Sequence, residues 1–259
     1  MTDDALLALA ADLAREAGAV ILAIRARGFT TERKPDASPV TEADHAAEAL
    51  ILRGLRAAAP DVPVVAEEEM AAGHVVARAE TFWLVDPLDG TKEFAAGRDD
   101  FTVNIALLRD GRPVLGVVGV PAQDALYRGR VGAGASRTDA DGTRPIAARL
   151  PPTDGLAVLA SRSHANLPAL AEHLAGQPVA SIGNVGSSVK FCRLAEGAAD
   201  LYPRFGRTME WDTAAGQAVL EAAGGAVRTE DGAPLAYGKP GWENPFFFAT
   251  GRRPGPRAG

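Results

Sequence analysis

Residues 83–94 read WLVDPLDGTKEF, and the expected fold follows from this stretch. Its strand-forming residues end at Asp86, and the turn residues that follow bring Asp89 round so that both carboxylates can face one point. Gly90 and Thr91 are expected to open a helical turn whose free N–H groups point the same way and suit a phosphate. Taken alone, the DPLDG segment is equally consistent with an ordinary turn at the end of a strand.

A second acidic group lies just upstream, where VPVVA is followed by EEE. Glu67 stands at the end of this predicted strand and meets Asp86 and Asp89 if the two strands are neighbours. Three carboxylates at that distance repel one another unless a cation lies between them. An oxygen ligand set without His or Cys favours Mg²⁺, or Mn²⁺, over zinc.

Composition restricts the possible partners. The chain has 259 residues, of which 47% are hydrophobic and 23% charged, as in ordinary globular proteins. A net charge of −6 without a basic, aromatic-rich stripe argues against a nucleic-acid polymer, although a small anion stays compatible. Cys192 is the single cysteine; it excludes an internal disulfide framework and is expected to be buried and noncatalytic. The acidic start and the lack of a long apolar run predict a cytoplasmic protein without membrane insertion, and a homodimer is compatible with the sequence.

The first half of the chain predicts two helices followed by strands. Apolar residues recur at helical spacing over 6–24, and Gly28 ends that helix. Thr41 caps a second helix that has Asp44 in its first turn. Strands follow after residue 60, two of them joined by a hairpin at the Asp-Gly pair 110–111. This order indicates an α+β half that comprises residues 1–150.

Strands and helices alternate in the second half. The segment AARLPPTDG at 147–155 is a predicted boundary, and strands near 156–161, 178–183 and 199–205 alternate with helices near 167–174 and 188–196. This alternation of strands and helices is typical of an α/β unit, predicted for residues 151–250. Residues 251–259 are expected to be a flexible tail. The overall class is therefore mixed, α+β with α/β.

A further acid stands in WDTAAGQAVLEAAGG, residues 211–225. Asp212 lies where a helix is expected to begin, and Gly224 and Gly225 close that helix. An isolated aspartate at this position is most simply explained as a helix cap.

Several motifs together carry a family resemblance. These are SPVTEAD, DPLDGTKEF, FTVNIALL, SRSH, GSSVKFC, LYPRFG and the WDTAAG segment, in this order. The series resembles the inositol monophosphatase superfamily of metal-dependent, lithium-sensitive phosphatases and, within it, the bacterial 3'(2'),5'-bisphosphate nucleotidases. The resemblance runs from about Leu6 to Phe248 and implies the sugar-phosphatase fold, a layered α-β-α-β-α sandwich of two subdomains.

The resemblance also assigns roles to residues. It makes the acids, together with one backbone carbonyl, ligands of two or three Mg²⁺ ions: Glu67, Asp86, Asp89, Asp212 and the carbonyl of Leu88. Glu67 thereby also belongs to the catalytic set. Asp44 and Thr91 match the dyad that helps to remove a proton from the attacking water, and Gly90, Thr91 and Lys92 match the residues that hold the scissile phosphate. Ala66 departs from the pattern, because relatives often have Ser or Gly there.

The implied reaction is removal of the 3'-phosphate from 3'-phosphoadenosine 5'-phosphate (PAP), or from its sulfated relative PAPS. Lys190 and Arg204 are candidates for binding the second phosphate, with Ser187, Ser188 and Asp212 as further substrate contacts. Ser161, Ser163 and His164 lack the setting of a nucleophile elbow, so no covalent intermediate is expected.

Two other functions stay open on the sequence. An inositol-1-monophosphatase or another sugar phosphatase is the alternative activity. A noncatalytic metal- or phosphate-binding protein is the alternative of another class. Loss of Asp44 or Thr91 would have favoured it, but both residues are present.

Overall fold

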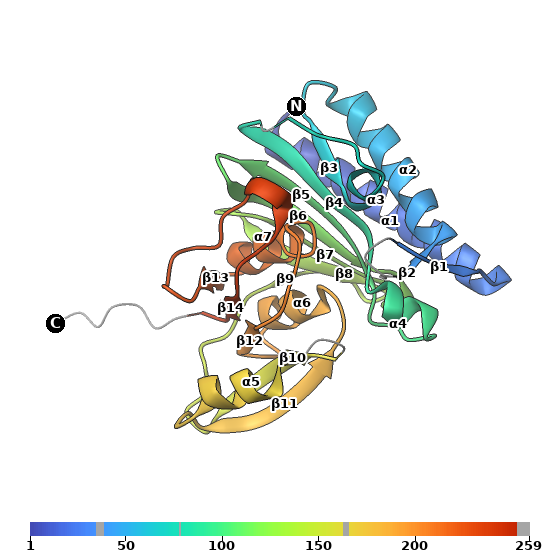
Figure 1. Cartoon of the computed structure of the whole chain (residues 1–259). Coiled ribbons are helices and arrows are strands. Elements are labelled where there is room, and N and C mark those ends of the chain that lie inside the picture. Colours follow the sequence, from blue (N-terminus) through green and yellow to red (C-terminus); the bar gives the residue numbers. More distant parts are fainter. Residues whose placement is uncertain (35–38, 78, 163–165, 253–259) are drawn as a thin grey trace.

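Helices and sheets alternate in five layers in the computed structural model, which describes residues 1–34, 39–77, 79–162 and 166–252 (Figure 1). Two helices cover the outer face of a seven-stranded sheet, two more lie between that sheet and a five-stranded sheet, and one helix covers the far side. The predicted α-β-α-β-α sandwich is therefore confirmed. Of the helices in the described part of the chain, none has the length and apolarity that a membrane span requires.

The first sheet carries the acidic stretch from which the fold was predicted. Its strands, in spatial order, are β3 (Val64–Ala66), β4 (Thr81–Asp89), β5 (Thr102–Arg109), β6 (Arg112–Val120), β7 (Ala125–Arg130), β8 (Gly134–Asp139) and β9 (Gly142–Ile146). Only the β3–β4 pair in this sheet is parallel. The hairpin between β5 and β6 turns at Asp110 and Gly111, both with positive φ, as predicted for an Asp-Gly turn.

The outer helices are α1 (Asp3–Arg27) and α2 (Glu42–Ala58), which bury their apolar faces against β4 to β6. Gly28 ends α1 with a positive φ. Thr41 caps α2 in a capping box, in which its side chain accepts from the backbone and Asp44 bonds back to the Thr41 N–H. Both helices match the prediction, and the cap fixes the Asp44 carboxylate at the start of α2.

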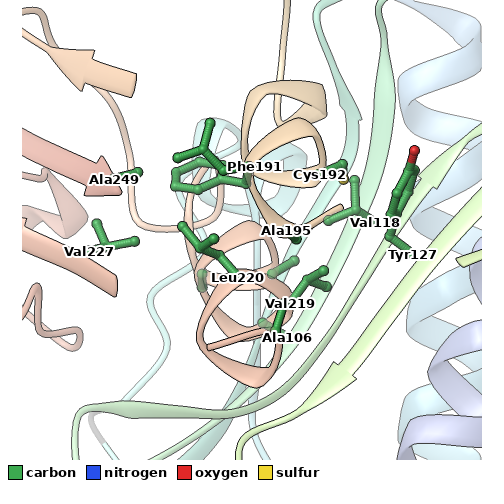
Figure 2. Close-up of a cluster of buried hydrophobic side chains, with 14 of the residues drawn as sticks. Ala106, Val118, Tyr127, Phe191, Cys192, Ala195, Val219, Leu220, Val227 and Ala249 are labelled. Carbon is green, nitrogen blue, oxygen red and sulfur yellow. The ribbon is translucent and has the colours of Figure 1, made fainter. Parts of the chain in front are cut away.

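The inner helices are α6 (Val189–Ala195) and α7 (Ala214–Ala222). Figure 2 shows their side chains meeting residues of both sheets in one core: Phe191, Cys192, Ala195, Val219 and Leu220 lie among Ala106, Val118, Tyr127, Val227 and Ala249. A Cβ atom at Gly116 of β6 would lie 2.5 Å from the carbonyl oxygen of Ala215, so glycine permits α7 to approach the sheet this closely. The second half of the chain thus packs directly on the first sheet.

The second sheet has the spatial order β11, β10, β12, β14, β13. Its strands are β10 (Leu156–Ser161), β11 (Val179–Val185), β12 (Leu201–Arg204), β13 (Ala226–Thr229) and β14 (Phe247–Thr250). Helix α5 (Leu167–Leu174) covers the outer face through Leu170 and Leu174. The predicted alternation of strands and helices is confirmed here. The division of the chain at 147–155 stays a prediction, although β9 ends before this segment and β10 begins within one residue of its end.

Several short elements were not predicted, and one helix begins later than expected. The unpredicted short elements are β1 (Thr31–Arg33), β2 (Pro39–Thr41), α3 (Glu67–Ala71) and the 3₁₀ turns η1 (Pro121–Gln123) and η2 (Pro240–Trp242). The short helix α4 (Thr91–Ala95) forms where a helical turn was expected after Gly90. Helix α7 starts at Ala214, not at Asp212, because Asp212 lies in a turn and its carboxylate accepts from the N–H of Met209. Asp212 is therefore not the cap of α7.

Cys192 is buried within the inner layer, as predicted. Burial raises the pKa of its thiol well above the ordinary range, and Glu196 adds to this effect. The thiol is therefore protonated and packs as a small apolar side chain.

Candidate active site

The parallel pairing of β3 and β4 brings the two acidic segments together. Ala66 lies opposite Val85 in the register, so Glu67 and Asp86 leave the sheet at the same edge. Both line an open cleft of about 880 Å³, together with Asp89 and Asp212. Asp212 reaches the cleft from the segment before α7, which lies against the first sheet. The condition on which Glu67 was expected to meet the aspartates, that the two strands are neighbours, is thus fulfilled. The cleft has the size of a small-molecule site.

Burial and mutual repulsion raise the pKa values of three of the four carboxylates. Burial is the main cause that raises the pKa of Asp86 well above its ordinary value, and Glu67, Asp89 and Asp212 add repulsion. Burial likewise raises the pKa of Asp212, with Asp89 and Glu67 as further causes. Burial raises the pKa of Asp89 although Lys190 opposes the shift. A positive charge between these groups would relieve all three.

Backbone N–H groups fix one oxygen of each aspartate. Asp86 Oδ1 accepts from the N–H of Leu88 at 3.0 Å, and Asp212 Oδ2 accepts from the N–H of Met209 at 2.8 Å. Asp89 Oδ2 accepts from the N–H of Ser188 at 2.7 Å. Among the described residues, the other carboxylate oxygen of each aspartate accepts no hydrogen bond. Each aspartate therefore has a fixed orientation and keeps one oxygen for a ligand.

Lys34 neutralises part of this cluster. Its Nζ lies 2.7 Å from Glu67 Oε1 and 2.6 Å from Glu68 Oε1, and only 9% of its side chain is exposed. Burial alone would lower the pKa of Lys34, but the attraction of Glu67 and the hydrogen bonds to both glutamates raise it overall. The sequence contained no signal for this contact, because Lys34 is 33 residues from Glu67 and belongs to no motif.

The donor set fits a hard divalent cation. As placed, no three His, Cys, Asp or Glu side chains within the described ranges form a ready metal cluster. The donors are nonetheless all oxygens, they are oriented by the backbone, and they repel one another, which is the chemistry that Mg²⁺ or Mn²⁺ relieves. A cation held by Glu67 would share that carboxylate with the ammonium group of Lys34, which lies 2.7 Å from Oε1, and the two positive charges would repel each other.

Replacing Lys34 by methionine should therefore separate stability from metal affinity. In EDTA the variant should be less stable by about 1–3 kcal/mol, since two glutamates lose a charged hydrogen-bond partner. In excess Mg²⁺ it should gain more stability than wild type, because no ammonium group then repels the cation. Thermal scans in both conditions measure this. Lys239→Met removes the ammonium partner of buried Glu210 outside the cleft but keeps the backbone N–H donors to that carboxylate, and it should lose stability equally in both conditions. The same behaviour in Lys34→Met would contradict the repulsion between Lys34 and the cation.

The two residues predicted to form a catalytic dyad lie within hydrogen-bonding distance. Thr91 Oγ1 lies 3.0 Å from Asp44 Oδ1 and 3.1 Å from the carbonyl oxygen of Leu88. The other oxygen of Asp44 accepts from the backbone N–H and the hydroxyl of Thr41. Burial raises the pKa of Asp44 despite these hydrogen bonds. Thr91 lines the cleft, whereas Asp44 lies buried behind it.

The predicted phosphate-holding residues lie at the start of α4. Gly90, Thr91 and Lys92 line the cleft. Gly90 has a φ of 93°, and a Cβ there would lie 3.0 Å from the carbonyl oxygen of Asp100. Only glycine suits this position, which places the first N–H groups of α4 beside the carboxylates.

Two buried cations line the same cleft. Lys190 Nζ donates to the carbonyl oxygens of Val185 and Ser187 and lies 4.9 Å from the ring centre of Tyr202. Burial lowers the pKa of Lys190 to about 8, against the opposing effect of Asp89. Arg204 is 7% exposed; it donates from one terminal nitrogen to the carbonyl of Arg207, while its buried Nε has no partner among the described residues.

The two serines of the GSSVK segment differ in position. Ser187 lines the cleft, and its φ of 45° marks a tight turn. Ser188 is 1% exposed, and its N–H and hydroxyl bond to Asp89 and to the carbonyl of Asp212. Of the SRSH motif, Ser161 lines the cleft, whereas Ser163 and His164 fall outside the described residues.

Comparison with known proteins agrees with this geometry. The sequence profile of the Inositol monophosphatase family matches residues 3–245, and the chain belongs to that family. It is 44% identical over 243 residues to the 3'(2'),5'-bisphosphate nucleotidase CysQ of Salmonella typhimurium, covering 92% of this chain and 96% of that one. It is 45% identical to the protein of the same name from Escherichia coli K12, over 87% of this chain and 91% of the relative.

Solved structures show the same fold. CysQ from Bacteroides thetaiotaomicron superposes with a TM-score of 0.82 at 34% identity, over 96% of this chain and 98% of that one. An inositol monophosphatase from Anabaena superposes with a TM-score of 0.78 at 31% identity, over 96% and 91% of the two chains. The family resemblance predicted from the motifs is confirmed.

Proposed function

We propose that this protein is a 3'(2'),5'-bisphosphate nucleotidase that uses two or three Mg²⁺ ions to remove the 3'-phosphate from PAP, or from PAPS. The observation that carries the proposal is the joint lining of one cleft by a strained carboxylate cluster and two buried cations. The named relatives support the same activity. The carboxylates suit metal-assisted attack on a phosphate, and the cations suit the second phosphate of such a nucleotide.

Five groups would hold the metal ions: the carboxylates of Glu67, Asp86, Asp89 and Asp212 and the carbonyl of Leu88. When bound, the ions supply charge neutralisation at the phosphate, activation of water and stabilisation of the leaving alkoxide. The N–H groups of Gly90, Thr91 and Lys92 orient the scissile phosphate at the start of α4.

Thr91 and Asp44 together accept the proton that the attacking water gives up. Because the Thr91 hydroxyl donates its proton towards Asp44, its lone pairs are left to accept a hydrogen bond from water. Hydrogen bonds from Thr41 hold the Asp44 carboxylate behind Thr91, where it can be ionised or protonated. Water can therefore pass its proton to the Thr91 hydroxyl while that hydroxyl passes its own proton to Asp44. Attack is then in line, without a side-chain nucleophile.

The second phosphate is assigned to the cationic side of the cleft. Arg204 Nε has no partner among the described residues, and Lys190 keeps its third N–H after donating to two carbonyls. Ser187 adds a hydroxyl at the cleft surface. A bisphosphate nucleotide carries a second charge that these groups suit, whereas inositol 1-phosphate carries none.

Phosphate release from PAP, PAPS and inositol 1-phosphate tests the proposal. With Mg²⁺ the purified protein should hydrolyse PAP fastest, Mn²⁺ should replace Mg²⁺ in part, and lithium or excess calcium should inhibit. Full activity in EDTA would refute the metal dependence. Faster turnover of inositol 1-phosphate would establish the alternative sugar phosphatase, and no release from any substrate would favour a noncatalytic binding protein.

A further inference from the structure

Ser188 lies where the two halves of the carboxylate cluster meet. Its backbone N–H donates to Asp89 Oδ2 at 2.7 Å, and its hydroxyl donates to the backbone carbonyl of Asp212 at 2.7 Å. Asp89 ends β4 in the first sheet, whereas Asp212 precedes α7 in the second half of the chain. One buried residue therefore contacts both an acid of the first half and the backbone of an acid of the second.

Asn104 also bonds to the Ser188 hydroxyl and shows which atom donates in each hydrogen bond. Its Nδ2 lies 3.1 Å from Ser188 Oγ, and its side chain is fully buried on β5 next to β4. Because the one hydroxyl proton of Ser188 goes to the Asp212 carbonyl, the hydroxyl oxygen accepts from Asn104. The chain of donors thus runs from Asn104 through Ser188 to Asp212, and Asn104 Oδ1 has no partner among the described residues.

The loop that carries Ser188 is held on both sides. The N–H of Gly186 lies 3.4 Å from Asp100 Oδ2, and a Cβ there would lie 2.8 Å from the Cγ of Glu93. Lys190 Nζ donates to two carbonyls of the same loop. A residue on so constrained a loop can set a distance between the groups that it contacts.

We propose that Ser188 is a positioning residue that fixes Asp89 relative to Asp212, while Ser187 alone of the pair faces the substrate. The proposal rests on the proposed metal site, to which both aspartates belong. A neutral hydroxyl suits the task, because a cationic side chain would compete with the metal and an acidic one would add repulsion. This positioning role replaces the substrate contact that the sequence analysis predicted for Ser188.

Mn²⁺ binding measured by electron paramagnetic resonance without substrate tests this role. Ser188→Ala keeps the N–H bond to Asp89 but frees the Asp212 backbone, and it should raise the Kd for Mn²⁺ about tenfold, as is typical when the support of a metal ligand is lost. At saturating Mg²⁺ the KM for PAP should change little. Ser187→Ala should do the reverse, raising KM and leaving the Mn²⁺ Kd unchanged.

Tyr127→Phe is the matched control. The Tyr127 hydroxyl donates to Glu196 at 2.9 Å and so also joins the first sheet to the segment after α6, but Tyr127 does not line the cleft. Its loss should lower the melting temperature without changing the Mn²⁺ Kd. This separates a general loosening of the two halves from a specific effect on the carboxylates.

If Ser188→Ala does not fold, Asn104→Leu tests the positioning role of Ser188 instead. It removes the donor to Ser188, a 3.5 Å contact with Asp89 Oδ2 and a buried oxygen that has no partner among the described residues, so it need not lose stability, yet it should raise the Mn²⁺ Kd severalfold. Thr102→Val removes only a 3.4 Å contact with the same Asp89 oxygen, and a much smaller effect there assigns the change to Ser188. Unchanged Mn²⁺ affinity in the folded variants would overturn the role of Ser188 while leaving the enzyme activity of the wild type intact. Failure of the wild type itself to bind Mn²⁺ would instead overturn the metal site.

Discussion

Thr91→Val should lower the kcat for PAP hydrolysis by about 10²–10⁴-fold, the range associated with loss of general acid–base assistance. Valine keeps the shape of threonine but removes the hydroxyl that lies 3.0 Å from Asp44. The proton of the attacking water then has no route to a base. Asp44→Asn should cause a loss of similar size, because an amide accepts no proton at neutral pH. Steady-state kinetics at saturating Mg²⁺ measure both.

The double variant is the control for this prediction. If Thr91 and Asp44 act as one unit, combining the substitutions should cost little more than either alone. Melting temperatures and Mn²⁺ affinity should stay close to wild type in Thr91→Val, so that the lost rate reflects chemistry. A kcat within a factor of a few of wild type would refute the dyad.

Arg204→Ala should reduce kcat/KM for PAP by roughly ten- to a hundredfold, since a charge-assisted contact is worth ~1.5–3 kcal/mol. A nucleoside 3'-monophosphate, which lacks the second charge, should lose much less. Lys190→Ala should show the same preference together with a loss on both substrates, because Lys190 also holds the carbonyls of Val185 and Ser187.

Arg228→Ala is a matched control for Arg204, since its Nε is likewise buried without a partner among the described residues but it lies on β13 outside the cleft. It should leave the ratio of the two substrates unchanged. Equal losses on both substrates in Arg204→Ala would mean that Arg204 supports the fold only.

Local patterns were enough to predict the carboxylate edge of the first sheet. The apolar run before Asp86, the turn residues after it and the Thr41 cap all act over a few residues, and each one formed as expected. The pairing of β3 with β4 was only a condition for Glu67 to meet Asp86, and the register shows that it is fulfilled.

The contacts that sequence reasoning missed join distant parts of the chain. Lys34 reaches Glu67 across 33 residues, and Ser188 reaches Asp89 across 99, with no periodicity to indicate either. Strands β7 to β9 were also missed, because their segment is rich in Gly and Arg and much of it is exposed, so the alternation of apolar and polar residues is weak. Asp212 was placed at a helix start because nothing local distinguishes a turn residue from a cap.

The Asp89→Asn variant tests most directly whether the four acids meet on a cation. Asparagine keeps an oxygen that accepts from the Ser188 N–H, but it removes the negative charge of a carboxylate whose pKa is raised by burial. In EDTA the variant should therefore be no less stable than wild type. With Mg²⁺ at a hundredfold excess over Kd the wild type should gain ~2.7 kcal/mol, and the variant should lose most of that gain.

Thermal scans of both proteins in EDTA and in excess Mg²⁺ are the decisive measurement. The account predicts that the order of stability reverses when the metal is added, with wild type more stable only in Mg²⁺. Parallel shifts, in which asparagine changes the melting temperature by the same amount in both conditions, would show that Asp89 is a turn residue and would contradict the metal site on which the proposed chemistry depends.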